Sequence, residues 1–142
     1  MTRRALFLAP FAACAAARPR ADSGQEVWDL FASLAAALSE GHSGEFLKGF
    51  DPAMPGGDKL RADVTGLLRQ AQVQSSIEML GNEGDDRVRR VELDWILRID
   101  SRQDAGGSVR RRQNIKCRVA KAGRKWRIVA WEPLDFFAPP KL

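Results

Sequence analysis

Five side chains on the predicted strands of this sequence have types and spacing that could form a small polar site. Arg111 and Gln113 fall on positions of their strand that otherwise carry apolar residues, so they should point inward. Trp126 and Glu132 share one phase of the last strand, and Trp95 lies on the apolar phase of the second. A buried arginine needs a partner, and an inward Glu132 could be that partner. The predicted ligand-binding residues are therefore Trp95, Arg111, Gln113, Trp126 and Glu132.

Two kinds of chemistry are open to this group. A few polar side chains that converge in an apolar pocket would bind a small ligand, either apolar or anionic. In the catalytic alternative, Glu132 would act as a base and Arg111 as an electrophile, as in a cofactor-free isomerase, hydratase or cyclase. That chemistry requires a pocket carboxylate with a raised pKa. A third interpretation gives no site, because Arg111 could lie near a strand end and extend to water.

A second group of candidates consists of cations that alternate along the third predicted strand. Four of them project from one face of an extended chain, namely Arg110, Arg112, Lys116 and Arg118. Such a basic stripe could contact phospholipid headgroups, an acidic envelope polymer or an acidic protein. The second strand offers Glu92, Asp94 and Asp100 in the matching outward phase. Cross-strand pairs of opposite charge contribute about 0.2–1 kcal/mol each, so a solvated, charge-balanced face is the simpler interpretation.

Composition and short motifs exclude several classes of function. The 142 residues include 23 Lys and Arg against 18 Asp and Glu, a net charge of +5, which is too small to indicate nucleic-acid binding. The sequence has no metal-ligand spacing, no glycine-rich phosphate loop and no nucleophile elbow, so we predict neither a metal nor a cofactor. Cys117 falls on an apolar phase and should be a buried, unreactive thiol.

The N-terminal segment has the pattern of an export signal. Arg3 and Arg4 precede an apolar run, and three alanines then form a small-residue exit. The paired arginines resemble a twin-arginine signal, and the residues up to Cys14 resemble a lipoprotein motif that would be lipidated there. We predict a periplasmic or membrane-anchored protein of the bacterial envelope that meets the membrane only through this segment or a lipid. The predicted ranges are 1–17 for the signal peptide, 18–22 for a linker and 23–140 for one domain.

The elements that would position these side chains follow from the apolar periodicity. Apolar residues recur at helical spacing in three segments, 23–40, 43–50 and 58–71, and Ser23 with Glu26 matches a capping box. The period then changes to two, which predicts four strands, with a bulge near 89–90 where Val88 breaks the alternation. We therefore predict an α+β fold, with three N-terminal helices packed on a curved, mainly antiparallel sheet of four or more strands.

This order of elements resembles the nuclear transport factor 2-like superfamily, the cone-shaped α+β fold of ketosteroid isomerase, scytalone dehydratase and polyketide cyclase-like proteins. The resemblance covers residues 23–140 and is closest to an exported bacterial, polyketide cyclase-like branch. It is carried by the FDPAMP segment at 50–55, the Gly-x-x-Trp-x-Ile pattern at 123–128 and the trailing Phe136-Phe137. It implies a cone with an apolar cavity at its open end and, in many members, a homodimer formed through the outer sheet face. The two phenylalanines should fold back as a plug.

The catalytic residues of the superfamily do not carry over to this sequence. The isomerase-type oxyanion hole needs a tyrosine, and this chain has none. The single histidine, His42, lies in the predicted loop between the first two helices. We therefore favour a small-ligand-binding or envelope interaction module over an enzyme, with a dimeric assembly domain as a further alternative. The enzyme hypothesis fails if Glu132 and Arg111 point to solvent, or if Trp95 and Trp126 fill the cone.

Overall fold

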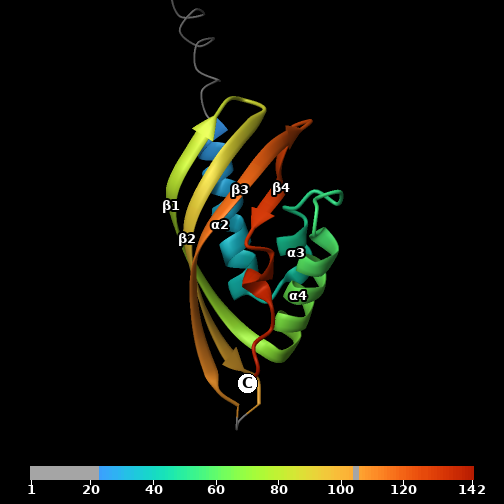
Figure 1. The fold of residues 1–142 in the computed structure, drawn as a ribbon, viewed down its shortest axis with the longest axis vertical. Coiled ribbons are helices and arrows are strands. Elements are labelled where there is room, and N and C mark those ends of the chain that lie inside the picture. The colour runs from blue at the N-terminus through green and yellow to red at the C-terminus, as the bar shows by residue number, and fades with distance from the viewer. Residues whose placement is uncertain (1–22, 104–105) are drawn as a thin grey trace, which may run out of the picture.

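In the computed structural model, which describes residues 23–103 and 106–142, three helices precede a four-stranded antiparallel sheet (Figure 1). The helices are α2 (Ser23–Ser39), α3 (Ser43–Leu47) and α4 (Gly57–Gln70). The strands are β1 (Ala71–Gly84), β2 (Val88–Ser101), β3 (Ser108–Ala122) and β4 (Lys125–Glu132), followed by the 3-10 helix η1 (Leu134–Phe137). Strands adjacent in sequence are adjacent in the sheet. The predicted α+β class, with helices packed on a curved antiparallel sheet, is confirmed.

Some predictions concern residues outside this range. The signal peptide at 1–17, the linker at 18–22 and the lipidation of Cys14 lie outside the described residues, so they stay predictions. Among the described residues, no helix is both long enough and apolar enough to cross a membrane.

The helices bury their apolar stripes against the inner face of the sheet. In α2, Val27, Phe31 and Leu38 are fully buried, as their spacing of four and seven residues requires. The capping pair expected at the start of this helix engages distant residues instead. Ser23 donates a hydrogen bond from its Oγ to Asp86 over 2.8 Å, and Glu26 accepts one from Trp126.

Strand β2 supplies the centre of the core, and its alternation is the one expected. Every second residue is buried, namely Val91, Leu93, Trp95, Leu97 and Ile99. The prediction of a bulge near 89–90 is wrong, because β2 and β3 pair without interruption. The irregularity lies on the other neighbour, where Leu80 is the extra residue of β1 and is 52% exposed. Val88 is simply exposed at the start of its strand.

Strand β4 contains a second bulge, and this one reverses its alternation. Arg118 pairs with Ala130, and Val119 pairs with Ile128, so Val129 is an extra residue. A bulge shifts the phase of all residues beyond it by one. As a result Trp126 and Trp131 are both buried although their spacing is odd, and Glu132 is exposed.

Aromatic rings fill the space between the sheet and the helices. Six of them form a continuous cluster with ring centroids 5.0 to 6.3 Å apart, consisting of Phe46, Phe50, Trp95, Trp131, Phe136 and Phe137. All of these contacts are edge-to-face or tilted, as the ring quadrupole favours. Phe136 and Phe137 belong to η1 and are buried in this cluster, so the expected plug is confirmed. The interior of the cone is therefore packed where an apolar cavity was expected.

The core tryptophan Trp95 has one polar atom, and that atom has a partner. Its indole nitrogen donates a 2.7 Å hydrogen bond to the hydroxyl of Ser75 on β1. The backbone N–H of Ser75 donates in turn to Ser39 at the end of α2. These two bonds join the centre of the sheet to the helix that covers it.

Replacing Ser75 by alanine should leave the indole N–H of Trp95 buried without an acceptor. We expect Ser75→Ala to lower the free energy of unfolding by about 1–3 kcal/mol in urea denaturation. The matched control is Ser76→Ala, one residue along on the exposed side of the same strand, which should change it by less than about 0.5 kcal/mol. Equal losses in the two variants would contradict a stabilising role for the Trp95–Ser75 bond.

Candidate functional site

The structure does not bring the five predicted ligand-binding residues together. Trp95 is fully buried on β2, and Trp126 is buried on β4, with β3 between these two strands. Gln113 pairs in register with Trp95 but is exposed. Glu132 is exposed opposite Lys116 on the outer face, so the expectation that it points inward is wrong. The bulge at Val129 is the reason.

Arg111 has a structural partner other than Glu132. Its guanidinium donates a hydrogen bond to the backbone carbonyl of Phe136 and so holds η1 against the sheet. Burial lowers the pKa of Arg111, and the charges of Asp135 and Asp63 act in the opposite direction. No charged or polar residue of the described chain is fully buried. The two carboxylates that act on this arginine do not form an inward base: Asp135 is exposed, and Asp63 is half-buried and paired with Lys59.

The basic stripe on β3 is only partly balanced by acidic neighbours. Arg112 binds Asp94 through two nitrogens, with its closest contact at 2.6 Å. It is the one member of the stripe with an ion pair among the described residues. Arg110 lies directly opposite Arg98, and Arg118 lies opposite Arg90. Like charges in register repel, so this face is more basic than a fully balanced pairing would be.

Neither the thiol nor the acidic groups point to a nucleophile or a metal. Burial raises the pKa of the Cys117 thiol to about 12, so the side chain behaves as an apolar group. Within residues 23–103 and 106–142, no group of three or more His, Cys, Asp or Glu side chains could hold a metal ion.

A groove of about 1030 Å³ lies between α2, the segment 45–52 and the start of β4. We call it the α2–β4 groove. Its apolar lining consists of Leu30, Leu34, Ala37, Leu47, Phe50, Pro52 and Trp126. Its basic residues are Lys48, Arg61, Arg124, Lys125 and Arg127, and its acidic residues are Glu26, Asp29 and Glu45. The groove thus combines an apolar lining with an excess of positive charge.

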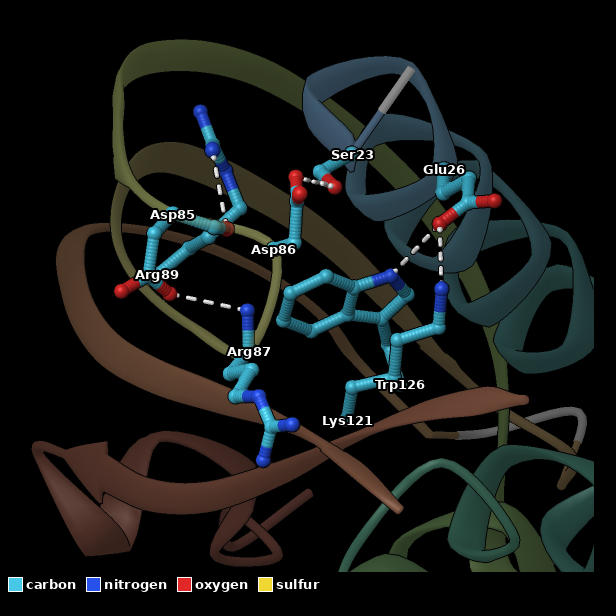
Figure 2. Close-up of polar contacts among 8 residues, drawn as sticks. All are labelled: Ser23, Glu26, Asp85, Asp86, Arg87, Arg89, Lys121 and Trp126. Carbon is cyan, nitrogen blue, oxygen red and sulfur yellow. Dashed lines mark hydrogen bonds and ion pairs between the residues drawn. The ribbon is translucent and has the colours of Figure 1, made fainter. Parts of the chain in front are cut away.

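One end of the groove is fixed by a polar contact between α2 and the sheet (Figure 2). The indole nitrogen of Trp126 donates to Oε1 of Glu26 over 2.9 Å, and Nζ of Lys121 lies 3.4 Å from the same oxygen. The hydrogen bond from Trp126 is the main reason that the pKa of Glu26 is lowered; Lys121 adds to it, and burial opposes it. Lys121 also lies 5.8 Å from the centroid of the Trp126 ring.

The backbone of β4 is open at the same place. Ile128 donates its N–H to Gly49 and accepts from Asp51, both over 2.8 Å, so its backbone groups face away from β3. In an antiparallel pair, residues whose backbone groups face away from the partner strand alternate with residues that bond to it. Trp126 lies two residues before Ile128, so its N–H and C=O also face away from β3. The register partner of Trp126 is Lys121. The backbone N–H of Lys121 donates to the carbonyl of Arg87 on the side away from β4, which confirms that Lys121 and Trp126 do not bond to each other through their backbones. The backbone of Trp126 therefore faces the groove.

A glycine allows the neighbouring segment to approach α2 this closely. A Cβ atom at Gly49 would lie 2.7 Å from a methyl group of Leu34. Gly49 therefore lets the segment 49–51 reach Ile128, and the groove begins where that contact ends.

The sequence offered few clues to this groove. Glu26 was assigned to helix capping, and its real partner lies 100 residues away. Leu30 shares the helical spacing of the buried residues of α2, so the sequence did not separate it from the core. One signal was present, because the odd spacing of Trp126 and Trp131 cannot bury both rings without a bulge.

The comparisons with known proteins concern the fold alone. No family model and no curated protein matches the sequence. The solved structures do match. An NTF-2-like protein of unknown function from Shewanella oneidensis MR-1 gives a TM-score of 0.62 at 12% identity, covering 75% of this chain and 94% of that one. The chain has the nuclear transport factor 2-like fold.

Two further solved structures match the chain over most of their own length. A ketosteroid isomerase-like protein from Erwinia carotovora atroseptica gives a TM-score of 0.64 at 9% identity, covering 79% of this chain and 95% of that one. A conserved protein from Planctomyces limnophilus gives 0.67 at 7% identity, covering 75% and 91%.

Acid should break the contact between Glu26 and Trp126. The pKa of Glu26 is lowered from its ordinary value of 4.5, so the stabilisation is complete above 4.5 and is lost as pH falls through the folded-state value. The indole Nε1–H resonance of Trp126 should move with a midpoint below 4.5 in an NMR titration.

In Glu26→Gln this movement should disappear, whereas Glu40→Gln, at an exposed position just beyond the same helix, should keep it. A midpoint at or above 4.5 in the unchanged chain would contradict the assigned contact.

Proposed function

We propose that this chain is a non-catalytic binding module that uses the α2–β4 groove rather than the interior of its cone. The observation that carries the proposal is the packing of the interior, where aromatic rings occupy the space in which a ligand was expected. The groove offers what the interior lacks, an accessible apolar lining beside fixed charges. Its volume of about 1030 Å³ is at the upper end of the usual size of small-ligand sites.

The lining favours a ligand with an apolar body and an anionic group. Leu30 and Leu47 are half-buried, so a bound apolar group would remove their remaining surface from water. Arg124, Lys125 and Arg127 form no ion pair within the described part of the chain. A carboxylate or sulfonate on the ligand could therefore pair with cations that are available.

The same groove argues against the catalytic alternative. A general base that works near neutral pH needs a carboxylate with a raised pKa. The hydrogen bond from Trp126 lowers the pKa of Glu26, and the one from Lys48 lowers that of Glu45. Both groups are therefore weaker bases than a free glutamate.

We infer in addition that the chain acts in the bacterial envelope, after removal of residues 1–17. The arginine pair, the apolar run and the small-residue exit support this inference. A dimer through the outer sheet face is not part of this proposal and stays a prediction. That face carries both signs of charge, with Glu92, Asp94 and Glu132 beside Arg98 and Arg110.

The fluorescent probe 8-anilinonaphthalene-1-sulfonate combines an apolar aromatic body with one anionic group and tests the groove directly. We expect saturable binding at one site of the folded chain, measured as a rise in probe fluorescence. Leu30→Asp should weaken this binding by about tenfold, because it places a charge in the apolar lining.

The matched control is Ala32→Asp, which adds the same charge on the exposed side of α2 and should bind the probe like the unchanged chain. Circular dichroism confirms that both variants are folded. Absence of binding, or equal weakening in the two variants, would contradict the proposal.

A further inference from the structure

We propose that the α2–β4 groove binds an extended acidic segment of another polypeptide, which adds as a strand to the free edge of β4. This inference rests on the proposed function and names the chemical class of its ligand. It follows from three features of the edge, which are its backbone groups, the side-chain pattern beside them and its charge.

The first feature is that the chain's own edge segment leaves β4 too early. The parallel bridge between Phe50 and Ile128 covers one position of the edge. Before it, α3 ends at Leu47, and Lys48 is still helical, with φ −62° and ψ −21°. The chain therefore turns away before it reaches Trp126. The outward N–H and C=O of Trp126 lie next in line along the same edge.

The second feature is that one extended residue can satisfy both backbone groups. In an antiparallel pair, two opposing residues exchange both N–H···O bonds. A strand laid antiparallel to β4, with one residue opposite Trp126, would make both bonds. Binding by strand addition draws affinity from such main-chain bonds and specificity from alternate side chains.

The third feature is the side-chain pattern that such a strand would meet. Trp126 points inward, so the residue opposite it would also point inward, towards Leu30 and Leu34. Its two neighbours would point outward beside Lys125 and Arg127. Opposite charges in facing positions stabilise a strand pair, and like charges oppose it. The bound segment that fits these positions therefore has an apolar residue between two acidic residues.

Charge also separates this occupant from the chain's own N-terminal segment. Residues 1–22 contain four arginines and Asp22, and residues 18–22, which remain after removal of 1–17, contain Arg18, Arg20 and Asp22, so both forms of the segment are net positive. A segment of that charge would be repelled by the β4 cations. An acidic segment of another protein is therefore the occupant that the edge favours.

The test measures peptide binding to the full chain by isothermal titration calorimetry. The probe is acetyl-Ser-Glu-Leu-Glu-Ser-amide, and we expect it to bind at one site. The lysine counterpart, acetyl-Ser-Lys-Leu-Lys-Ser-amide, should bind at least about tenfold more weakly. N-methylation of the leucine removes the N–H that would bond to the carbonyl of Trp126. It should weaken the acidic peptide by about tenfold at unchanged charge.

Variants of the protein then locate the site. Lys125→Glu combined with Arg127→Glu should weaken the acidic peptide by about tenfold or more and should strengthen the lysine peptide. The matched control, Arg98→Glu combined with Arg110→Glu, changes the net charge equally on the outer face away from the groove. It should leave the affinity for the acidic peptide within about threefold of that of the unchanged chain.

The remaining outcomes separate the proposals. If the acidic peptide does not bind while the anilinonaphthalene probe still does, strand addition is wrong and the proposed function stands. If neither binds, both are wrong. If N-methylation of the leucine leaves the affinity of the acidic peptide unchanged, strand addition is wrong, even if the peptide binds through its charge. A further result would contradict the acidic partner: a dimer in sedimentation velocity that is lost when Lys125→Glu and Arg127→Glu are combined. The occupant of the groove would then be a second copy of the chain.

Discussion

The bulge at Val129 is the constraint on which the interior, the outer face and the free edge of this molecule all depend. A regular β4 would place Trp126 and Trp131 on opposite faces, because their spacing is odd. The extra residue turns both rings inward, and each is at most 6% exposed. Burying a second indole removes a large apolar area from water, whereas one unpaired residue interrupts the ladder only locally.

The bulge has two consequences for function. Trp131 enters the aromatic cluster and closes the interior against Trp95 and Phe137. Glu132, the best candidate for an inward carboxylate, is turned to solvent. The proposed binding site is therefore the groove beside Trp126, on the part of β4 that precedes the bulge. The fold is that of a cone, and the proposed site lies at its open strand edge.

Much of the fold could be predicted from the sequence, because its causes are local. Helical spacing located α2 and α4, and strict alternation located the buried face of β2. The ends of the elements depend on contacts with distant parts of the chain. Helix α3 ends at Leu47 because the next residues bond to Ile128 in β4, a contact that no local pattern specifies.

The site was harder to predict for the same reason. Arg111 was expected to need a carboxylate, but a backbone carbonyl of η1 serves as its partner. Glu26 had a plausible local role, and only the fold brings it to Trp126. The alternation of inward and outward side chains shifts by one at a bulge. The predicted inward direction of Glu132 was therefore wrong because of one extra residue, Val129. Long-range pairing decides such positions, and a strand pattern alone does not contain it.

The most direct test of this account is amide hydrogen exchange of β4 in the free protein, followed residue by residue by NMR. The open edge predicts that the amide of Trp126 exchanges at least about 100-fold faster than those of Arg127 and Ile128, which bond to β3 and to Gly49. Protection of Trp126 equal to that of its two neighbours would contradict the account, because the edge on which the groove depends would then be closed.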